Sequence, residues 1–155
     1  MGRIDYYHQD GSPAANSLVP GASAIVVDER GHILLQRRRD NSRWALPGGV
    51  MEIGEDIGRT AAREVEEETG IEVEPEHVVG VYSDPEHVFT YDDGEVRQEF
   101  SVCIACRVTG GRLSPGDEAL EARYFEPDDI PGLDMHPSIR KRIDDYREGR
   151  RAVIA

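Results

Sequence analysis

The pattern of apolar and polar positions predicts a series of short β-strands. Two apolar runs, residues 21–28 and 32–38, are joined by a polar turn that contains Gly31, and this arrangement predicts a β-hairpin. Three further segments have the apolar content of strands, namely residues 71–82, 96–108 and 122–125. The polar residues 84–95 are expected to form a loop or the end of a long hairpin.

Two other segments have the features of amphipathic helices. Within residues 56–69 apolar side chains recur every four positions, and Gly70 follows as a helix-ending residue. Residues 137–149 predict a terminal helix, because Pro137 lies near its start and Gly149 at its end. Since strands lie on both sides of the first helix, a mixed α/β layer structure is expected.

The length of the chain fits a single domain. At 155 residues it is close to the usual size of about 100–200 residues per domain, and residues 20–150 are expected to form it. Residues 1–19 are polar and contain chain-breaking residues, which predicts a flexible N-terminal segment. The longest aliphatic run, residues 24–27, is far shorter than the roughly 20 apolar residues of a spanning helix, so no membrane partner is expected.

The chain is strongly acidic, and this restricts its partners. It has 18 basic and 31 acidic side chains, which gives a formal net charge of −13. Such a surface repels nucleic acid, so bulk DNA or RNA binding is not expected. An anionic small molecule remains compatible with this charge if a metal ion or a local arginine patch reverses the sign at one site.

The two cysteines are expected to be ordinary thiols. Cys103 and Cys106 lie three positions apart within a predicted strand, and residues at this spacing face opposite sides of a sheet. A zinc or redox site needs both sulfur atoms on one side, so two half-buried free thiols are the better interpretation. Free thiols indicate a reducing, cytoplasmic compartment.

Three glutamates of the first helix are expected to share one stripe of its surface. At about 100° per residue, Glu64, Glu67 and Glu68 fall within roughly 100° of one another, while Glu66 points away. Each like-charged pair at this spacing costs about 0.2–0.5 kcal/mol, and the negative end of the helix dipole adds to the repulsion. The stripe is either a solvated acidic face or a site for a divalent cation such as Mg²⁺, which prefers oxygen ligands.

Nine positions in and around this helix follow a defined pattern. They spell G-x5-E-x7-R-E-U-x-E-E-x-G-U, where U is a bulky aliphatic residue: Gly49, Glu55, Arg63, Glu64, Val65, Glu67, Glu68, Gly70 and Ile71. The pattern resembles the Nudix box at every position, and residues 44–49 and 118–125 are also similar to the family. The resemblance implies the Nudix fold, a mixed β-sheet sandwiched between helices, and a MutT-like pyrophosphohydrolase.

The resemblance also implies roles for individual residues. Glu67 and Glu68 are implied to be the principal ligands of Mg²⁺ or Mn²⁺, with the carbonyl of Gly48 as a third. Glu64 is implied to be a further ligand or the base that orients the attacking water. Arg63 is implied to pair with a carboxylate of the box, a task that suits its planar guanidinium group.

Two residues outside the box are further candidates. Some relatives carry the general base in a later loop, where this chain has Glu118; the alternative is an exposed loop carboxylate. An arginine at the position of Arg38 binds a substrate phosphate in some relatives; the alternative is a solvated strand end. Since Glu64 lies one helical turn from Glu67 and Glu68, we expect Glu64 rather than Glu118 to activate the water.

The implied reaction is hydrolysis of the pyrophosphate bond in a nucleoside diphosphate linked to another group. Nucleoside triphosphates, ADP-ribose and dinucleotides are all open as substrates, and Pro85, 15 residues after Gly70, favours ADP-ribose. A non-catalytic regulatory domain is the alternative, but the intact box argues against it. An isopentenyl diphosphate isomerase is disfavoured because neither cysteine lies in a loop. The expected partner is a nucleotide small molecule, and a homodimer is left open.

Overall fold

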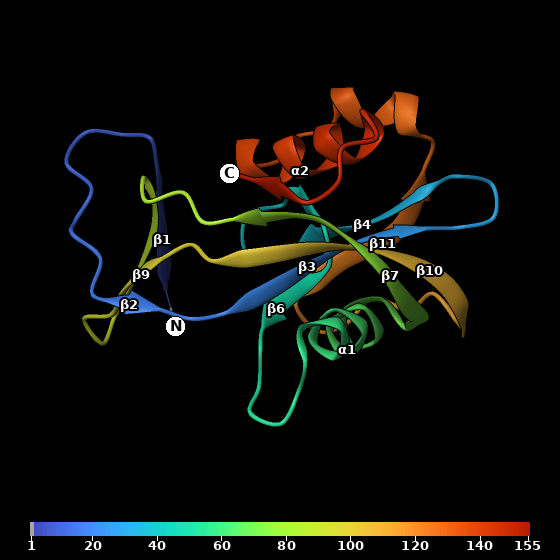
Figure 1. Ribbon diagram of the computed structural model, residues 1–155, viewed down its shortest axis with the longest axis horizontal. Helices are drawn as coiled ribbons and strands as arrows, with labels where there is room; N and C mark the ends of the chain where they lie inside the picture. Colours follow the sequence, from blue (N-terminus) through green and yellow to red (C-terminus); the bar gives the residue numbers. More distant parts are fainter. Residues whose placement is uncertain (1) are drawn as a thin grey trace.

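The computed structural model of the protein describes residues 2–155 (Figure 1). Its elements in chain order are β1 (Arg3–Tyr7), β2 (Ser17–Leu18), β3 (Gly21–Val27), β4 (Ile33–Arg38), β5 (Trp44–Ala45), β6 (Gly48–Val50), α1 (Ile57–Thr69), β7 (Ile71–Tyr82), β8 (His87–Tyr91), β9 (Val96–Gln98), β10 (Ser101–Gly111), β11 (Ala119–Phe125), the 3₁₀ helix η1 (Pro127–Gly132), α2 (Pro137–Arg147) and β12 (Val153–Ile154).

The large sheet is mixed and has helices on both faces. Its strand order is β11-β4-β3-β10-β7-β12, with β5 paired to β4 and β6 to β3. Strand β3 runs parallel to β10, and β10 runs antiparallel to β7. Figure 1 shows α1 below this sheet and α2 above it. The predicted α/β fold with a mixed sheet between helices is therefore confirmed.

Alternation along the central strands produces two separate cores. In β3, Ile25 faces α2 and packs with Leu35 and Ile143, whereas its neighbour Val26 faces α1 and packs with Val65. Both faces of the sheet are therefore buried, as expected for strands that read as continuous apolar runs.

The two cysteines lie on opposite faces of the sheet, as predicted. Cys103 belongs to the core beneath α2, and Cys106 belongs to the core beneath α1. Both are free and fully buried rather than half-buried, because a helix covers each face.

Helix α1 has the predicted start and end. The side chain of Asp56 accepts a hydrogen bond from the amide of Arg59 at 2.8 Å and caps the first turn. Gly70 has φ of 78°, and its amide donates to the carbonyl of Glu66, which ends the helix in a left-handed cap. The helix therefore presents Glu64, Glu67 and Glu68 at a fixed place beside the sheet.

A second, four-stranded sheet contains two strands from the N-terminal segment for which the sequence predicts flexibility. Strand β1 pairs with β8 from Arg3–Tyr91 to Tyr7–His87, and β2 pairs with β9. Residues 84–95, for which the sequence predicts a loop or a hairpin end, supply β8 and the turn that leads to β9. The partners of β1 lie 80 to 88 residues away in the chain, so no local pattern indicates the pairing. Figure 1 shows this small sheet on the left, beside the large one.

Within residues 2–155, no helix combines the length and the apolar character needed to cross a membrane.

Candidate active site

Arg63 gathers the carboxylates of the predicted cluster. Its Nε donates to Glu55 at 2.5 Å, and its Nη1 donates to Glu64 at 2.8 Å and to Glu67 at 3.2 Å. Its Nη2 donates to the carbonyl of Val50 at 3.0 Å, which ties the helix to the end of β6. The sequence predicts a pair with one carboxylate of the box; the guanidinium group contacts three.

Glu55 holds the side chain of Arg63 in place through hydrogen bonds to its guanidinium group. It also accepts hydrogen bonds from the amide of Glu52 at 2.9 Å and from the hydroxyl of Thr60 at 3.0 Å. The hydrogen bond from Arg63 is the main cause that lowers the pKa of Glu55 to about 2. Glu55 thus stays ionised and holds Arg63, which in turn orients Glu64.

Glu68 points inward, toward the sheet. Its carboxylate accepts hydrogen bonds from the side chain of Gln36 on β4 and, at 3.4 Å, from the amide of Gly48 on β6. Burial, together with the neighbouring Glu64, raises the pKa of Glu68 to about 9. A cation bound beside Glu68 would oppose this shift, because it favours the ionised carboxylate.

This donor set fits a hard divalent cation. Glu64 and Glu67 both contact Arg63, Glu64 is also next to Glu68, and Mg²⁺ and Mn²⁺ prefer oxygen ligands. Gly48 lies beside Glu68, where the sequence predicts a carbonyl ligand. The chemistry of these oxygen donors therefore suits a divalent cation.

Two glycines allow the β5–β6 segment to pass close to the carboxylates. A Cβ atom on Gly49 would lie 2.4 Å from a carboxylate oxygen of Glu64. A Cβ atom on Gly48 would lie 2.4 Å from the carbonyl oxygen of Ala22. A larger residue at Gly48 would push β6 away from β3, whereas one at Gly49 would displace the side chain of Glu64.

Arg38 lies near the carboxylates but is engaged with a neighbour. Its guanidinium group forms two hydrogen bonds to Asp40, at 2.9 and 2.6 Å. The hydrogen bond to Asp40 is the main cause that raises the pKa of Arg38, and the negative charges of Glu68 and Glu118 add to it. Arg38, Glu68 and Glu118 are thus brought into one neighbourhood, although they come from three separate segments.

Glu118 lies in the loop before β11, and this loop is attached to the end of α1. The amide of Gly116 donates to the carbonyl of Glu68 at 2.9 Å, and the amide of Ser114 donates to that of Thr69 at 2.7 Å. The side chain of Glu118 is exposed. The loop therefore holds Glu118 at the edge of the site rather than within the cluster.

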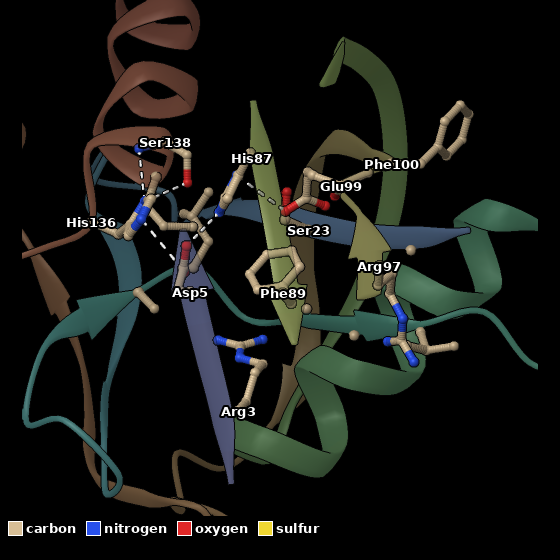
Figure 2. A pocket seen from close by; sticks show the side chains of 18 of the residues that line it. Arg3, Asp5, Ser23, His87, Phe89, Arg97, Glu99, Phe100, His136 and Ser138 are labelled. Carbon is tan, nitrogen blue, oxygen red and sulfur yellow. Dashed lines mark hydrogen bonds and ion pairs between the residues drawn. The ribbon is translucent and has the colours of Figure 1, made fainter. Parts of the chain in front are cut away.

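A cavity of about 220 Å³ opens next to the cluster (Figure 2). It lies between the small sheet and strands β3, β5 and β6, and it reaches Gly48 and Gly49 at one end. Its aromatic lining residues are Trp44, Phe89, Tyr91 and Phe100. A flat apolar ring would find stacking partners here, beside the carboxylates.

One wall of the cavity carries a polar group that the sequence does not indicate. Nε2 of His87 lies 3.0 Å from Asp5, and Nε2 of His136 lies 3.5 Å from it (Figure 2). Burial acts to raise the pKa of Asp5, but the hydrogen bonds from His136 and His87 outweigh it and hold this pKa below its usual range. These three residues are 49 to 131 positions apart in the chain.

The hydrogen bonds of His136 argue against a metal ion in this second group. Its Nδ1 accepts the amide hydrogen of Ser138 at 3.1 Å, so the proton of the neutral ring is on Nε2, which faces Asp5. A metal ligand needs a free lone pair at Nε2. Asp5, His87 and His136 lie close enough to surround an ion, but the tautomer of His136 suits a hydrogen-bonded cluster.

Similarity to known proteins identifies the class to which this fold and site belong. The NUDIX domain model matches residues 17–146, and the chain belongs to the NUDIX family. It is an enzyme, a hydrolase of the Nudix type.

Individual relatives agree with this assignment. The chain is 34% identical over 128 residues to an ADP-ribose pyrophosphatase of Methanocaldococcus jannaschii, covering 80% of this chain and 72% of the relative. It is 32% identical over 134 residues to a putative 8-oxo-dGTP diphosphatase of Bacillus subtilis, covering 86% and 83%. A NUDIX hydrolase structure from Nitrosomonas europaea superposes with a TM-score of 0.70 at 23% identity, covering 88% and 93%, and shares the fold.

Proposed function

We propose that the protein hydrolyses the pyrophosphate bond of a nucleoside diphosphate linked to another group, with Mg²⁺ or Mn²⁺ held by Glu64, Glu67 and Glu68. The observation that carries the proposal is the carboxylate cluster around Arg63, which contacts both Glu64 and Glu67, with Glu68 directed toward β4 and β6 beside them. The bound cation would offset the charge of the diphosphate and increase the electrophilicity of its phosphorus atom.

Other side chains of the site activate the water and bind the substrate. Arg63 fixes the position of Glu64, whose carboxylate accepts the proton of the attacking water. Arg38 contacts a phosphate of the substrate, in exchange for one of its hydrogen bonds to Asp40. Glu118 is the alternative base, and its loop would have to move toward the cluster to act.

The cavity supports a nucleotide substrate, because aromatic side chains line it and it reaches Gly48 and Gly49, which adjoin the carboxylates. The names of the two relatives favour ADP-ribose and oxidised nucleoside triphosphates as the first substrates to test. Pro85, placed as in the family members that cleave ADP-ribose, favours the former. A non-catalytic regulatory role is disfavoured by the complete cluster.

The environment of the enzyme follows from its thiols and charge. Two free buried cysteines support a reducing cytoplasm, and the charge of −13 supports small nucleotides rather than nucleic acid as partners. A homodimer is compatible with the exposed apolar side chains of Leu18 and Ile154.

The test is a screen of ADP-ribose, dinucleotides and nucleoside triphosphates with millimolar Mg²⁺ or Mn²⁺. We expect release of a nucleoside monophosphate from at least one of them. Glu67→Gln should lower turnover by roughly 10²–10⁴-fold with unchanged circular dichroism, because it removes charge stabilisation at the reacting group. Glu66→Gln, which changes the same charge on the exposed side of α1, is the matched control. Absence of hydrolysis across the panel, or normal turnover in Glu67→Gln, would contradict the proposal.

A further inference from the structure

Strand β1 lies outside the residues that match the family model, yet it forms a wall of the cavity. The model matches residues 17–146, whereas β1 spans Arg3–Tyr7. Arg3 and Asp5 both line the cavity, as side chains two positions apart on a strand face the same way (Figure 2). The contribution of β1 is therefore a property of this chain beyond the common domain.

The position of β1 is set by its backbone pairing with β8 and by the side-chain contacts of Asp5. Five residues pair in register with β8, and Asp5 contacts His87 of β8 and His136 at the start of α2. The strand is thus fixed to both sides of the cavity. A residue at its outer end, such as Arg3, is held in place rather than left on a mobile terminus.

Arg3 differs from the other arginines of the cavity. Its guanidinium group lies 4.6 Å from the centre of the Phe89 ring, which supports it by a cation–π contact. Among residues 2–155, no carboxylate lies within ion-pair distance of it. The other four lie near carboxylates: Arg38 with Asp40 at 2.6 Å, Arg43 with Asp134 at 3.2 Å, Arg97 with Glu95 at 2.9 Å and Arg142 with Glu99 at 3.9 Å.

Arg3 is therefore the arginine of the cavity that no nearby carboxylate of residues 2–155 balances. The lining holds five arginines and two acidic residues, but three further carboxylates pair with these arginines from just outside the lining. In a chain with a net charge of −13, an unpaired arginine in a cleft is the group most available to an anionic ligand.

Arg3 and the carboxylate cluster lie on different sides of the cavity. Arg3 belongs to the small sheet, whereas Gly48 and Gly49 line the cavity from the large sheet. Gly48 contacts Glu68, and Gly49 lies against the carboxylate of Glu64. An anion at Arg3 would thus be separate from the diphosphate that the cluster serves.

We propose that Arg3 binds a second phosphate group of the substrate, one that is not part of the cleaved diphosphate. The inference rests on the proposed function and narrows it to nucleotides with an additional phosphate, such as nucleoside triphosphates or nucleotides phosphorylated on a sugar. A planar guanidinium group supported by an aromatic ring can donate two parallel hydrogen bonds to a phosphate. ADP-ribose lacks the additional group.

The experiment compares substrates that differ by one phosphate. ADP-ribose and ADP-ribose 2′-phosphate form one pair, and dGDP and dGTP form the other. The enzymes are wild type, Arg3→Ala, Arg3→Lys and Arg30→Ala; the last removes the same charge from the β3–β4 turn, at the far end of the large sheet from the small sheet (Figure 1). KM and kcat are measured separately for each, with circular dichroism to check folding.

We expect Arg3→Ala to weaken the binding of the substrate that carries the additional phosphate. In at least one pair, Arg3→Ala should raise the KM of the more phosphorylated member about tenfold, which corresponds to about 1.4 kcal/mol. The KM of the other member should rise less than about threefold, and kcat should not change. Arg3→Lys should recover part of the effect, because it keeps the charge but not the planar fork. Arg30→Ala should behave as wild type. Equal changes for both members of each pair would overturn the inference.

A binding measurement separates this inference from the proposed function. Calorimetry with AMP and adenosine 2′,5′-bisphosphate needs no hydrolysis. A tighter bisphosphate complex in wild type that is lost in Arg3→Ala supports the role of Arg3 even if no nucleotide is cleaved, which would refute the proposed function alone. Equal affinities of wild type and Arg3→Ala for the bisphosphate, together with equal changes for dGDP and dGTP, would refute the role of Arg3.

Discussion

Glu68 should make the metal-free protein less stable as the pH rises. Its pKa is raised from 4.5 to about 9 in the folded state, whereas in the unfolded chain it keeps the ordinary value. Between these values the folded state binds a proton that the unfolded state releases, and stability therefore falls with increasing pH. Below about pH 4.5 both states are protonated and the contribution is complete; above about pH 9 it is lost.

The size of the effect follows from the working range of pH. From pH 5 to pH 7.5 the unfolded chain has released the proton and the folded protein has not, so about 2.5 pH units at 1.36 kcal/mol each give roughly 3 kcal/mol. Any folded pKa above this range gives the same figure. For a chain of this length, 1 kcal/mol shifts Tm by about 2–4 °C, so the expected difference is about 6–12 °C.

The assay is thermal unfolding followed by circular dichroism in the presence of a chelator, for wild type, Glu68→Gln and Glu66→Gln. Between pH 5 and pH 7.5, the Tm of wild type and of Glu66→Gln should fall by about 6–12 °C more than the Tm of Glu68→Gln, which has no proton to lose. Millimolar Mg²⁺ should stabilise wild type more at pH 7.5 than at pH 5, since the cation competes with the proton. An equal pH dependence in wild type and Glu68→Gln would refute the reasoning.

Two further predictions concern the geometry of the cluster. Gly49→Ala should lower kcat by roughly 10²-fold or more with little loss of Tm, because the new methyl group displaces Glu64; a normal kcat in a steady-state assay would contradict this. Glu64→Gln should cost more turnover than Glu118→Gln and should remove the acidic limb of the kcat–pH profile; loss of that limb in Glu118→Gln alone would assign the base to the loop.

The helix and its carboxylates could be predicted because their spacing is local. Glu64, Glu67 and Glu68 lie within one and a half turns of one helix. Its cap residues, Asp56 and Gly70, directly precede and follow it in the sequence. The structure adds contacts that no local pattern contains, such as the hydrogen bond to Glu68 from a strand 32 positions earlier. The inward position of Glu68 and its raised pKa depend on that strand.

The cavity could not be predicted, because it is built from long-range pairings. Strand β1 pairs with β8 across 80 to 88 residues, and the sequence of residues 1–19 alone has the composition of a flexible segment. His87 and His136 belong to no motif of the sequence for the same reason: each is an isolated histidine until the small sheet and α2 bring both to Asp5. Sequence periodicity predicts elements, whereas the cavity depends on which elements meet.

The cysteines on opposite faces of the large sheet provide two reporters of conformational opening. Burial raises the pKa of Cys103 to about 11 and that of Cys106 to about 12, so neither forms a reactive thiolate in the closed protein. A thiol reagent can modify Cys106 only when the layer under α1 opens, and Cys103 only when the layer under α2 opens. Their labelling rates thus measure the two halves of the protein separately, and the half that responds to a bound cation is the one that carries its ligands.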